Sequence, residues 1–310
     1  MSAGDMALFV RVAELGSFAA VALEIGQTPS GVSKALTRLE DRLGVKLLHR
    51  TTRKLILTQE GETYLSHARP ILAAIEAADA EVAAQGGEPQ GLLRINTGTA
   101  FAKHRLAALL PGFQKAYPRV TLSLSVNDHR IDPLADQVDV TIRVGALSDS
   151  DLIAYPLGNV HRIIAASPDY LARFGTPERP RDLKAHNCLR LKGASAQTLW
   201  PMIENGHAVA CPVSGTIECD SADLLLDFAL AGLGIIRLGD FLGEKALADG
   251  RLIPLLAAYH NPTPAPITAL VLPGRQKLPR VRAFIDYLAR ATRSAHALDP
   301  APLIPPPAPL

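Results

Sequence analysis

The sequence predicts a multidomain α/β protein, and three observations support this prediction. The chain has 310 residues, which exceeds the length at which one hydrophobic core usually suffices. Helical patterns fill the N-terminal part, whereas strand-like and helical stretches alternate from residue 92 onward. Hydrophobic residues make up 48% of the chain and charged residues 20%, a balance that allows several packed cores.

Residues 28–43 form the clearest helical pattern. Thr28 can cap the helix, and Pro29 suits its first position, where a missing N–H is no loss. Apolar residues then recur at spacings of three and four, which places them on one buried stripe: Val32, Ala35, Leu36, Leu39 and Leu43. On the other face, Lys34, Arg38 and Arg42 stand four apart and line up along one edge. That face is suited to meet an anion.

The distribution of charge says more than the net charge. The 32 basic and 30 acidic residues nearly cancel over the whole chain. Between Lys34 and Lys54, however, seven basic residues face two acidic ones, a local excess of five positive charges. The excess lies in the helix at 28–43 and directly after it.

The neighbouring segments predict a winged helix-turn-helix. Apolar residues at 6–15 predict a first helix, and Ser17 caps a second, short helix. The turn at 26–27 leads into the helix at 28–43, and the second helix of such a pair enters the major groove of DNA. Residues 45–58 alternate enough to form a two-stranded wing.

The polar face of the recognition helix and the wing supply the predicted DNA contacts. The helix side chains are the candidates for base edges, and the wing cations are expected to position the protein on phosphates. The predicted DNA-binding residues are Ser30, Ser33, Lys34, Thr37, Arg38, Arg50, Arg53 and Lys54. An ordinary solvated helix face is the alternative, which the full winged-helix pattern disfavours. Glu40 is expected to partner nearby cations instead.

A long helix follows the wing. Its apolar residues repeat at heptad-like spacings: Leu65, Ala68, Leu72, Ile75 and Val82. Such a seam can pack on its own domain or pair with a second copy of the chain, and both interpretations stay open on spacing alone. The sequence GGEPQG at 86–91 predicts a hinge.

The remainder predicts an α/β domain. Strands are expected at 92–95, 120–126 and 138–144, with a helix between the first two, and this βαβ order predicts a parallel sheet covered by helices. Further helices are expected to start at Ser167-Pro168, Ser221 and Pro279, and a strand is expected near 267–272. The proline-rich end of the chain cannot form a packed core and predicts a disordered tail.

Two sets of residues carry a family resemblance. In the N-terminal part they are Ser17-Phe18, Val21-Ala22, Val32-Ser33-Lys34, Leu39-Glu40, Leu43-Gly44-Val45, Leu47-Leu48, Arg50, Thr58 and Gly61. In the C-terminal part they are Gly91-Leu92-Leu93-Arg94-Ile95, Asp139-Val140, Arg143, Ala166-Ser167-Pro168, Tyr170-Leu171, Gly175, Pro177, His186, Cys188-Leu189 and Ala231-Gly232-Leu233-Gly234-Ile235. Together they resemble the LysR-type transcriptional regulators, over residues 5 to about 292. Gln27 and Pro29 depart from the pattern, and Pro29 stands where relatives often carry a DNA-contacting glutamine.

The resemblance implies a domain organisation. It assigns residues 1–61 to a winged helix-turn-helix, 62–85 to a dimerisation linker helix, 86–91 to a hinge, 92–293 to a two-lobed effector-binding domain and 294–310 to the tail. One lobe then comprises 92–161 and 267–292, and the other 162–266. The implied function is sequence-specific, effector-modulated transcription regulation by a homodimer or homotetramer, with RNA polymerase as a further candidate partner. The alternative is an architectural or effector-independent DNA-binding repressor.

The resemblance also implies an effector site. Its candidate residues stand where relatives contact their ligands: Thr97, Thr99, His129, Arg143 and Ser221. Two helices are expected to begin there, and helix N-termini offer unpaired N–H groups to an anion. A small carboxylate is therefore the hypothesis for the ligand. As alternatives, Arg143 serves only a neighbouring carboxylate and Ser221 serves only as a cap.

Other functional classes lack their signatures. The sequence has no G-x-S-x-G, Walker or H-E-x-x-H motif, so we expect neither an enzyme nor a bound cofactor or metal. Cys188, Cys211 and Cys219 form no CxxC pair, which favours structural thiols in a reducing cytoplasm over a redox sensor. No apolar run approaches the roughly 20 residues that cross a bilayer, and no export signal is evident.

Overall fold

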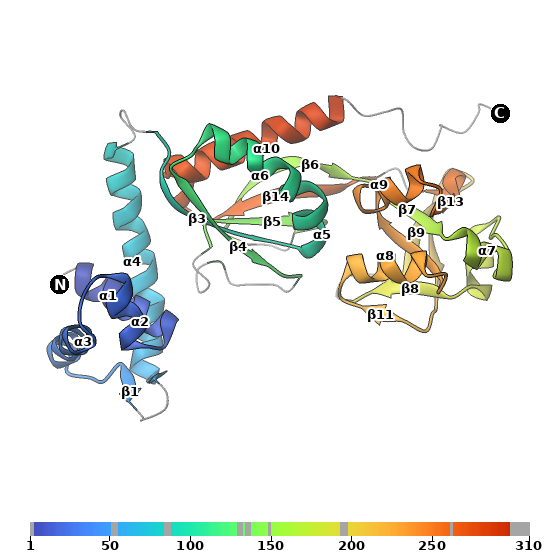
Figure 1. The fold of residues 1–310 in the computed structure, drawn as a ribbon. Helices are drawn as coiled ribbons and strands as arrows, with labels where there is room; N and C mark the ends of the chain where they lie inside the picture. Colours follow the sequence, from blue (N-terminus) through green and yellow to red (C-terminus); the bar gives the residue numbers. More distant parts are fainter. Residues whose placement is uncertain are drawn as a thin grey trace. The chain divides into compact units, whose positions relative to one another are not determined.

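The computed structural model of the chain describes residues 3–50, 55–83, 88–128, 133, 138–147, 150–192, 198–260 and 263–297 (Figure 1). These residues form two compact units. The first comprises Met1–Glu88 with Ile131–Val138 and Leu272–Pro279, and the second comprises the rest.

The first unit opens with three helices and a wing. The helices are α1 (Ala3–Leu15), α2 (Phe18–Glu24) and α3 (Pro29–Leu43). Strands β1 (Leu48–Arg50) and β2 (Leu55–Leu57) pair antiparallel, with Leu48 opposite Leu57. The helix-turn-helix and the two-stranded wing predicted from the sequence are both confirmed.

The helix ends follow the predicted capping chemistry. The Thr28 hydroxyl accepts a hydrogen bond from the Gly31 N–H at 3.2 Å, and Ser17 does the same for Ala20. Gly44 ends α3 with φ of 72°, a left-handed conformation that favours glycine. Local sequence therefore fixes where the recognition helix starts and stops.

Helix α4 (Gln59–Ala83) completes the core of this unit. Leu65 and Ala68 are buried in it, together with side chains of α1 to α3 such as Phe9, Leu36 and Leu39. The helix continues past Pro70. Beyond that point, Ile71 and Ile75 are 42% and 40% exposed. Leu65 and Ala68, at the start of the apolar seam, thus pack within the unit, whereas Ile71 and Ile75 face solvent.

Lobe I of the second unit is a five-stranded sheet in the order β4-β3-β5-β14-β6. Its strands are β3 (Gly91–Thr97), β4 (Val120–Val126), β5 (Val140–Val144), β6 (Ile153–Val160) and β14 (Ala265–Val271). Between β3 and β4 run α5 (Thr99–Phe101), the π-helical segment η1 (Ala102–Leu106) and α6 (Ala107–Ala116). After β14 the chain passes through η4 (Arg275–Lys277), which belongs to the first unit, into α10 (Pro279–Ala297).

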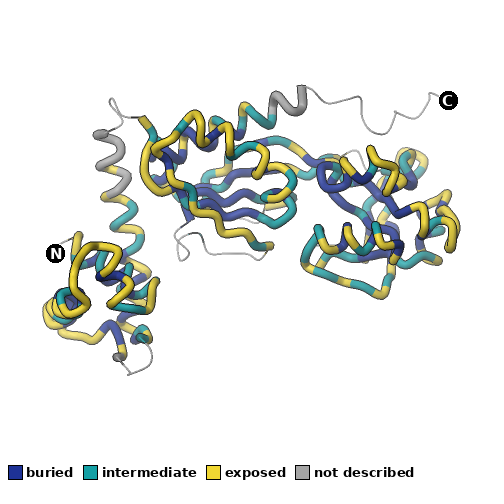
Figure 2. The backbone as a smooth tube through the Cα atoms, viewed as in Figure 1, coloured by how far each residue is buried: buried dark blue, intermediate teal, exposed yellow. Residues whose placement is uncertain are grey.

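Aromatic contacts hold α6 against α10. The rings of Phe113 and Phe284 lie 5.2 Å apart, and Tyr287 donates a hydrogen bond to the carbonyl of Leu109 at 3.1 Å. Both helices lie on the same side of the sheet (Figure 1). Burial concentrates in the central strands (Figure 2).

Lobe II is a second five-stranded sheet in the order β11-β8-β12-β7-β13. Its strands are β7 (Arg162–Ala166), β8 (Cys188–Leu191), β11 (Glu218–Cys219), β12 (Ile235–Gly239) and β13 (Ile253–Leu255). The helical segments are α7 (Pro168–Phe174), η2 (Pro180–Ala185), α8 (Ala222–Leu230), α9 (Asp240–Ala248) and η3 (Ala257–Tyr259). A hairpin of β9 (Leu199–Glu204) and β10 (His207–Pro212) turns through Asn205 and Gly206, both at positive φ.

The three strands predicted from the βαβ order are parallel, as expected, but the complete sheet of lobe I is mixed. In lobe I, β3 is parallel to β4 and β5, but β14 is antiparallel to β5 and β6. The chain leaves this sheet through β6, builds lobe II and returns through β14. Neighbouring strands that lead out of and into the same sheet must run in opposite directions.

Candidate DNA-binding surface and effector site

The outer face of α3 presents two cations without protein partners. Lys34 and Arg38 are exposed, and neither makes an ion pair with a residue that the structure describes. Arg42, the third cation of the same edge, instead contacts Asp5 at 3.2 Å. Two of the three predicted edge cations are therefore available to an external anion.

The hydroxyl groups of α3 have local partners. Ser30 Oγ lies 3.1 Å from Thr28 Oγ1 at the cap, and the Thr37 hydroxyl donates to the Ser33 carbonyl at 3.0 Å. Thr37 has therefore donated its proton and keeps acceptor capacity, whereas either hydroxyl of the Ser30–Thr28 pair can be the donor. The predicted wing contacts are not placed: Arg53, Lys54 and the side chain of Arg50 lie outside the described part of the chain.

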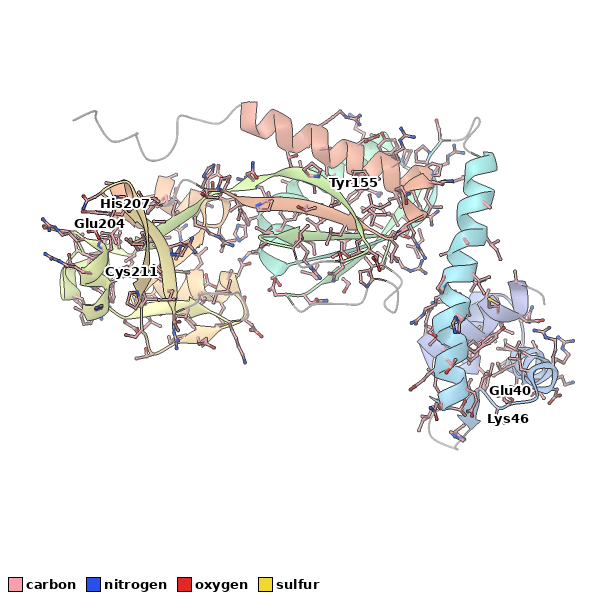
Figure 3. The ribbon with its side chains drawn as sticks, turned by 180° about the vertical axis from the view of Figure 1, so that it is seen from behind. Glu40, Lys46, Tyr155, Glu204, His207 and Cys211 are labelled. Carbon is pink, nitrogen blue, oxygen red and sulfur yellow. The ribbon has the colours of Figure 1, made fainter. Side chains whose placement is uncertain are left out.

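Glu40 joins α3 to the wing from the inner side (Figure 3). Its carboxylate is 1% exposed and accepts hydrogen bonds from Lys46 Nζ at 2.9 Å and from the N–H groups of Leu47 and Leu48 at 3.0 and 3.2 Å. Burial alone would raise the pKa of Glu40, but the bonds from Lys46 and the backbone outweigh it and lower that pKa. The sequence predicted the cation partner, but not the two backbone donors that dock the wing.

The predicted effector residues of lobe I lie around the start of α5. Thr97 ends β3 fully buried, and its hydroxyl has no hydrogen-bond partner among the residues that the structure describes. The Thr99 N–H donates to Asp128 Oδ1 at 3.0 Å. Arg143, in β5, donates to the Ile142 carbonyl at 3.4 Å and has further interactions. His129 lies outside the described residues.

Ser221 caps α8 in lobe II. Its hydroxyl accepts a hydrogen bond from the Leu224 N–H at 3.3 Å, the alternative role considered from sequence. In the first turn of the same helix, Asp223 Oδ1 contacts Lys103 Nζ at 3.0 Å and His104 Nε2 at 2.8 Å. Burial would raise the pKa of Asp223, but these two residues lower it overall.

Sequence reasoning missed the charged groups at both helix starts. Asp128 accepts a hydrogen bond from the first turn of α5, and Asp223 lies in the first turn of α8. The η1 segment of lobe I also reaches α9 of lobe II, where Arg105 contacts Glu244 at 3.2 Å and lies over the ring of Phe241 at 5.6 Å. Lys103, His104 and Arg105 are consecutive in the sequence, but only folding brings them to lobe II.

The cysteines are free thiols. Burial raises the pKa of Cys188 to about 12 and also raises the pKa of Cys211 (Figure 3), so both are held as inert thiols at neutral pH. Among the residues described, no group of three or more potential ligands could hold a metal ion. Within the same residues, no helix is both long and apolar enough to cross a membrane.

This architecture, a winged helix-turn-helix with free cations on its recognition helix joined to a two-lobed α/β domain, defines a DNA-binding transcription regulator. The chain belongs to the LysR family of such regulators. The family model described as "bacterial regulatory helix-turn-helix protein, lysR family" matches residues 4–62, and the model described as "LysR substrate binding domain" matches residues 86–293.

Named relatives agree with this assignment. The chain is 36% identical over 284 residues to the HTH-type transcriptional regulator CrgA of Neisseria meningitidis serogroup C, covering 92% of this chain and 95% of that one. It is 33% identical to the regulator DmlR of Escherichia coli K12, covering 92% of each. The solved structure of Neisseria CrgA gives a TM-score of 0.63 at 34% identity, covering 94% and 99%. The full-length Vibrio cholerae virulence activator AphB gives 0.60 at 27%, covering 93% and 98%.

Proposed function

We propose that the exposed face of α3 reads a specific DNA site and that the wing holds the protein on the phosphate backbone. The observation that carries this proposal is the pair of unpaired, exposed cations, Lys34 and Arg38, on a capped helix whose Arg42 is engaged internally. Ser30, Ser33 and Thr37 supply hydroxyl groups beside them. Arg50, Arg53 and Lys54 are assigned to phosphates, which carry no sequence information.

Two variants distinguish base contacts made by α3 from phosphate contacts made by the wing. Binding sites selected from random DNA by Lys34→Ala should differ from those of the wild type, because a base contact specifies sequence and is worth about 1–3 kcal/mol. Arg53→Ala should weaken every site about equally and reduce the salt dependence by about one phosphate. Lys46→Ala is the matched control, since that lysine is committed to Glu40. An unchanged preference in Lys34→Ala, with a changed one in Arg53→Ala, would reverse the assignment.

We further propose that a small molecule binds between the lobes at Thr97, Thr99, His129, Arg143 and Ser221 and shifts the DNA-bound assembly. The buried Thr97 hydroxyl without a partner supports this proposal. The contact from the Thr99 N–H to Asp128 supports a carboxylate ligand, because a carboxylate oxygen already fits that donor. Such a ligand must bind one assembly more tightly than another, since equal affinity shifts nothing.

Calorimetry with a panel of small carboxylates tests the effector site. A carboxylate that alters the DNA footprint should lose that effect, and the affinity that accompanies it, when Thr99→Val and Arg143→Ala are combined, and it should bind more tightly in Asp128→Asn, which removes the competing charge. Heat signals that none of these variants changes would contradict the proposal. If no metabolite alters the DNA footprint, the effector-independent repressor becomes the better description.

The exposed seam of α4 is assigned to self-association as a homodimer or a homotetramer. Ile71 and Ile75 are large apolar residues left in solvent by the fold. Ile75→Asp should therefore reduce the mass in sedimentation equilibrium. A polar substitution at Leu65, which is buried within the unit, would instead lower the stability of the fold.

A further inference from the structure

Two arginines of lobe II lie on one face of the sheet, close together. Strands β7 and β12 are antiparallel, with Ile164 opposite Arg237 and Arg162 opposite Gly239. Residues in this relation are diagonal neighbours on the same face, and their side chains are within mutual reach. The opposite face carries Ile163 and Leu238, which approach Gly243 of α9. The arginines therefore share the side away from α9.

Both guanidinium groups lack a partner. Each arginine is only partly exposed, and neither makes a hydrogen bond or an ion pair with any residue described in the structure. Burial lowers the pKa of Arg162, and burial together with Arg162 lowers the pKa of Arg237 to about 10. Both side chains therefore remain charged at neutral pH, next to one another.

One nearby carboxylate offsets part of this charge. Asp240 interacts electrostatically with Arg162, while its oxygens also accept the backbone N–H groups of His161 and Phe241 at 3.2 and 2.7 Å. His260 contacts the Leu255 carbonyl at 2.9 Å through Nε2, and burial is the main cause that lowers its pKa. Two guanidinium groups beside one carboxylate leave the site with a net positive charge.

Partly buried charges without partners are unfavourable, because the protein does not replace the water they lose. Two guanidinium groups side by side match the planar oxygens of a carboxylate or phosphate.

We infer that Arg162 and Arg237 form a binding site for a small oxyanion on lobe II. It is separate from the proposed effector residues, which lie in lobe I and at the cap of α8. Its occupant is a single carboxylate or phosphate group.

Titration of the full-length protein tests the inference. Sodium benzoate, sodium acetate and inorganic phosphate should be compared with sodium chloride at equal ionic strength, by calorimetry and by thermal unfolding. In the Thr99→Val/Arg143→Ala protein, which lacks the proposed effector site, one oxyanion should bind once per chain and raise Tm beyond the chloride control. Binding of benzoate without phosphate assigns an organic acid, and the reverse assigns a phosphate.

Substitutions of Arg162 and Arg237 distinguish this site from nonspecific anion binding and from the proposed effector site. Arg237→Met and Arg162→Met should each weaken binding about tenfold or more, because a hydrogen bond to a charged group is lost. Arg237→Met should also raise Tm in anion-free buffer, since it removes an uncompensated charge. Arg181→Met, at a highly exposed arginine of η2, is the matched control and should change neither quantity. The double variant Thr99→Val/Arg143→Ala should retain this binding.

Three results would overturn the inference. The first is an equal anion response in the wild type and in both methionine variants. The second is loss of the response in the Thr99→Val/Arg143→Ala protein, which would assign the anion to the effector site. The third is a lower Tm for Arg237→Met in anion-free buffer with no oxyanion effect in the wild type. That pattern would mean that the protein itself satisfies Arg237.

Discussion

Glu40 and the Arg162/Arg237 pair are charges partly or fully removed from solvent, and they differ in how many hydrogen bonds they make. Glu40 is nearly inaccessible, yet a lysine and two backbone N–H groups contact its carboxylate. The two arginines are less buried but have no hydrogen-bonding partner among the described residues. The first arrangement fastens the wing to α3, whereas the second leaves charge for a molecule that the chain does not supply.

The difference separates structural charge from available charge. A buried charge that is fully bonded holds parts of the fold together, and removing it leaves unsatisfied donors behind. A partly buried charge without partners costs stability until something binds it. Exposure alone would not make this distinction, because Lys34 and Arg38 are available while the exposed Lys46 is committed to Glu40.

Removal of Glu40 should have the largest effect on stability. Glu40→Ala leaves the Leu47 and Leu48 N–H groups buried without an acceptor, so the free energy of unfolding should fall by about 3 kcal/mol. Urea denaturation followed by circular dichroism measures it. Lys46→Met is the control, because the carboxylate keeps its backbone donors, and it should cost clearly less. Equal losses would mean that the ion pair, rather than the backbone bonds, fixes the wing.

Asp223 is an intermediate case, since its side chain is 12% exposed and one of its oxygens has no partner. Asp223→Asn removes the charge that Lys103 and His104 contact. The free energy of unfolding should fall by about 1.5 kcal/mol, the low end of the range for hydrogen bonds to charged groups, because Lys103 is 63% exposed. A double-mutant cycle with Lys103→Met would assign this loss to the contact, and additive effects would exclude coupling.

Acid should weaken the first unit through Glu40. Its folded pKa is lowered, so its stabilising contribution is complete above the unfolded pKa, near the ordinary value of 4.5, and is lost as pH falls through the folded pKa. Stability measured from pH 6 to 3 should therefore drop less steeply in Glu40→Gln than in the wild type. Parallel curves for the two proteins would show that Glu40 does not titrate in this window.

Neutralising Glu244 should have the smallest effect. Glu244 and Arg105 are 61% and 43% exposed at their contact, and exposed ion pairs are worth about 0–1 kcal/mol. Glu244→Gln should change the free energy of unfolding by less than about 0.5 kcal/mol, and 0.5 M NaCl should abolish even that difference. A loss as large as that of Asp223→Asn would remove the distinction between buried and exposed charge.

Local chemistry made the N-terminal domain predictable. Thr28, Ser17 and Gly44 act within a few residues of themselves, so their caps and turns can be read from the sequence. The predicted apolar stripe of α3 is buried at Val32, Ala35, Leu36 and Leu39, because helical periodicity fixes which residues share a face. Leu43 was predicted wrongly, since at the end of the helix it is 36% exposed. The wing was also predicted, although three of its proposed DNA contacts are not described.

Long-range relations were not predictable. The direction of β14 depends on a chain that returns after building lobe II. The contacts of Asp128 with Thr99 and of Asp223 with His104 join residues 29 and 119 positions apart. The pairing of Arg162 with Arg237 depends on the register of two strands. None of these residues stands in a local motif, so spacing along the chain carried no signal.

Pro70 has a mechanical consequence for α4. Proline removes a backbone hydrogen bond from the helix, just after Leu65 and Ala68 anchor its first turns in the core. Pro70 is therefore the point of lowest bending stiffness in α4, and it lies where the helix extends beyond the core of the helix-turn-helix. A bend of about 20° there would displace a point about ten residues further along, roughly 15 Å away, by about 5 Å. Bending at Pro70 reduces how much of a movement in the far half of α4 reaches the recognition helix.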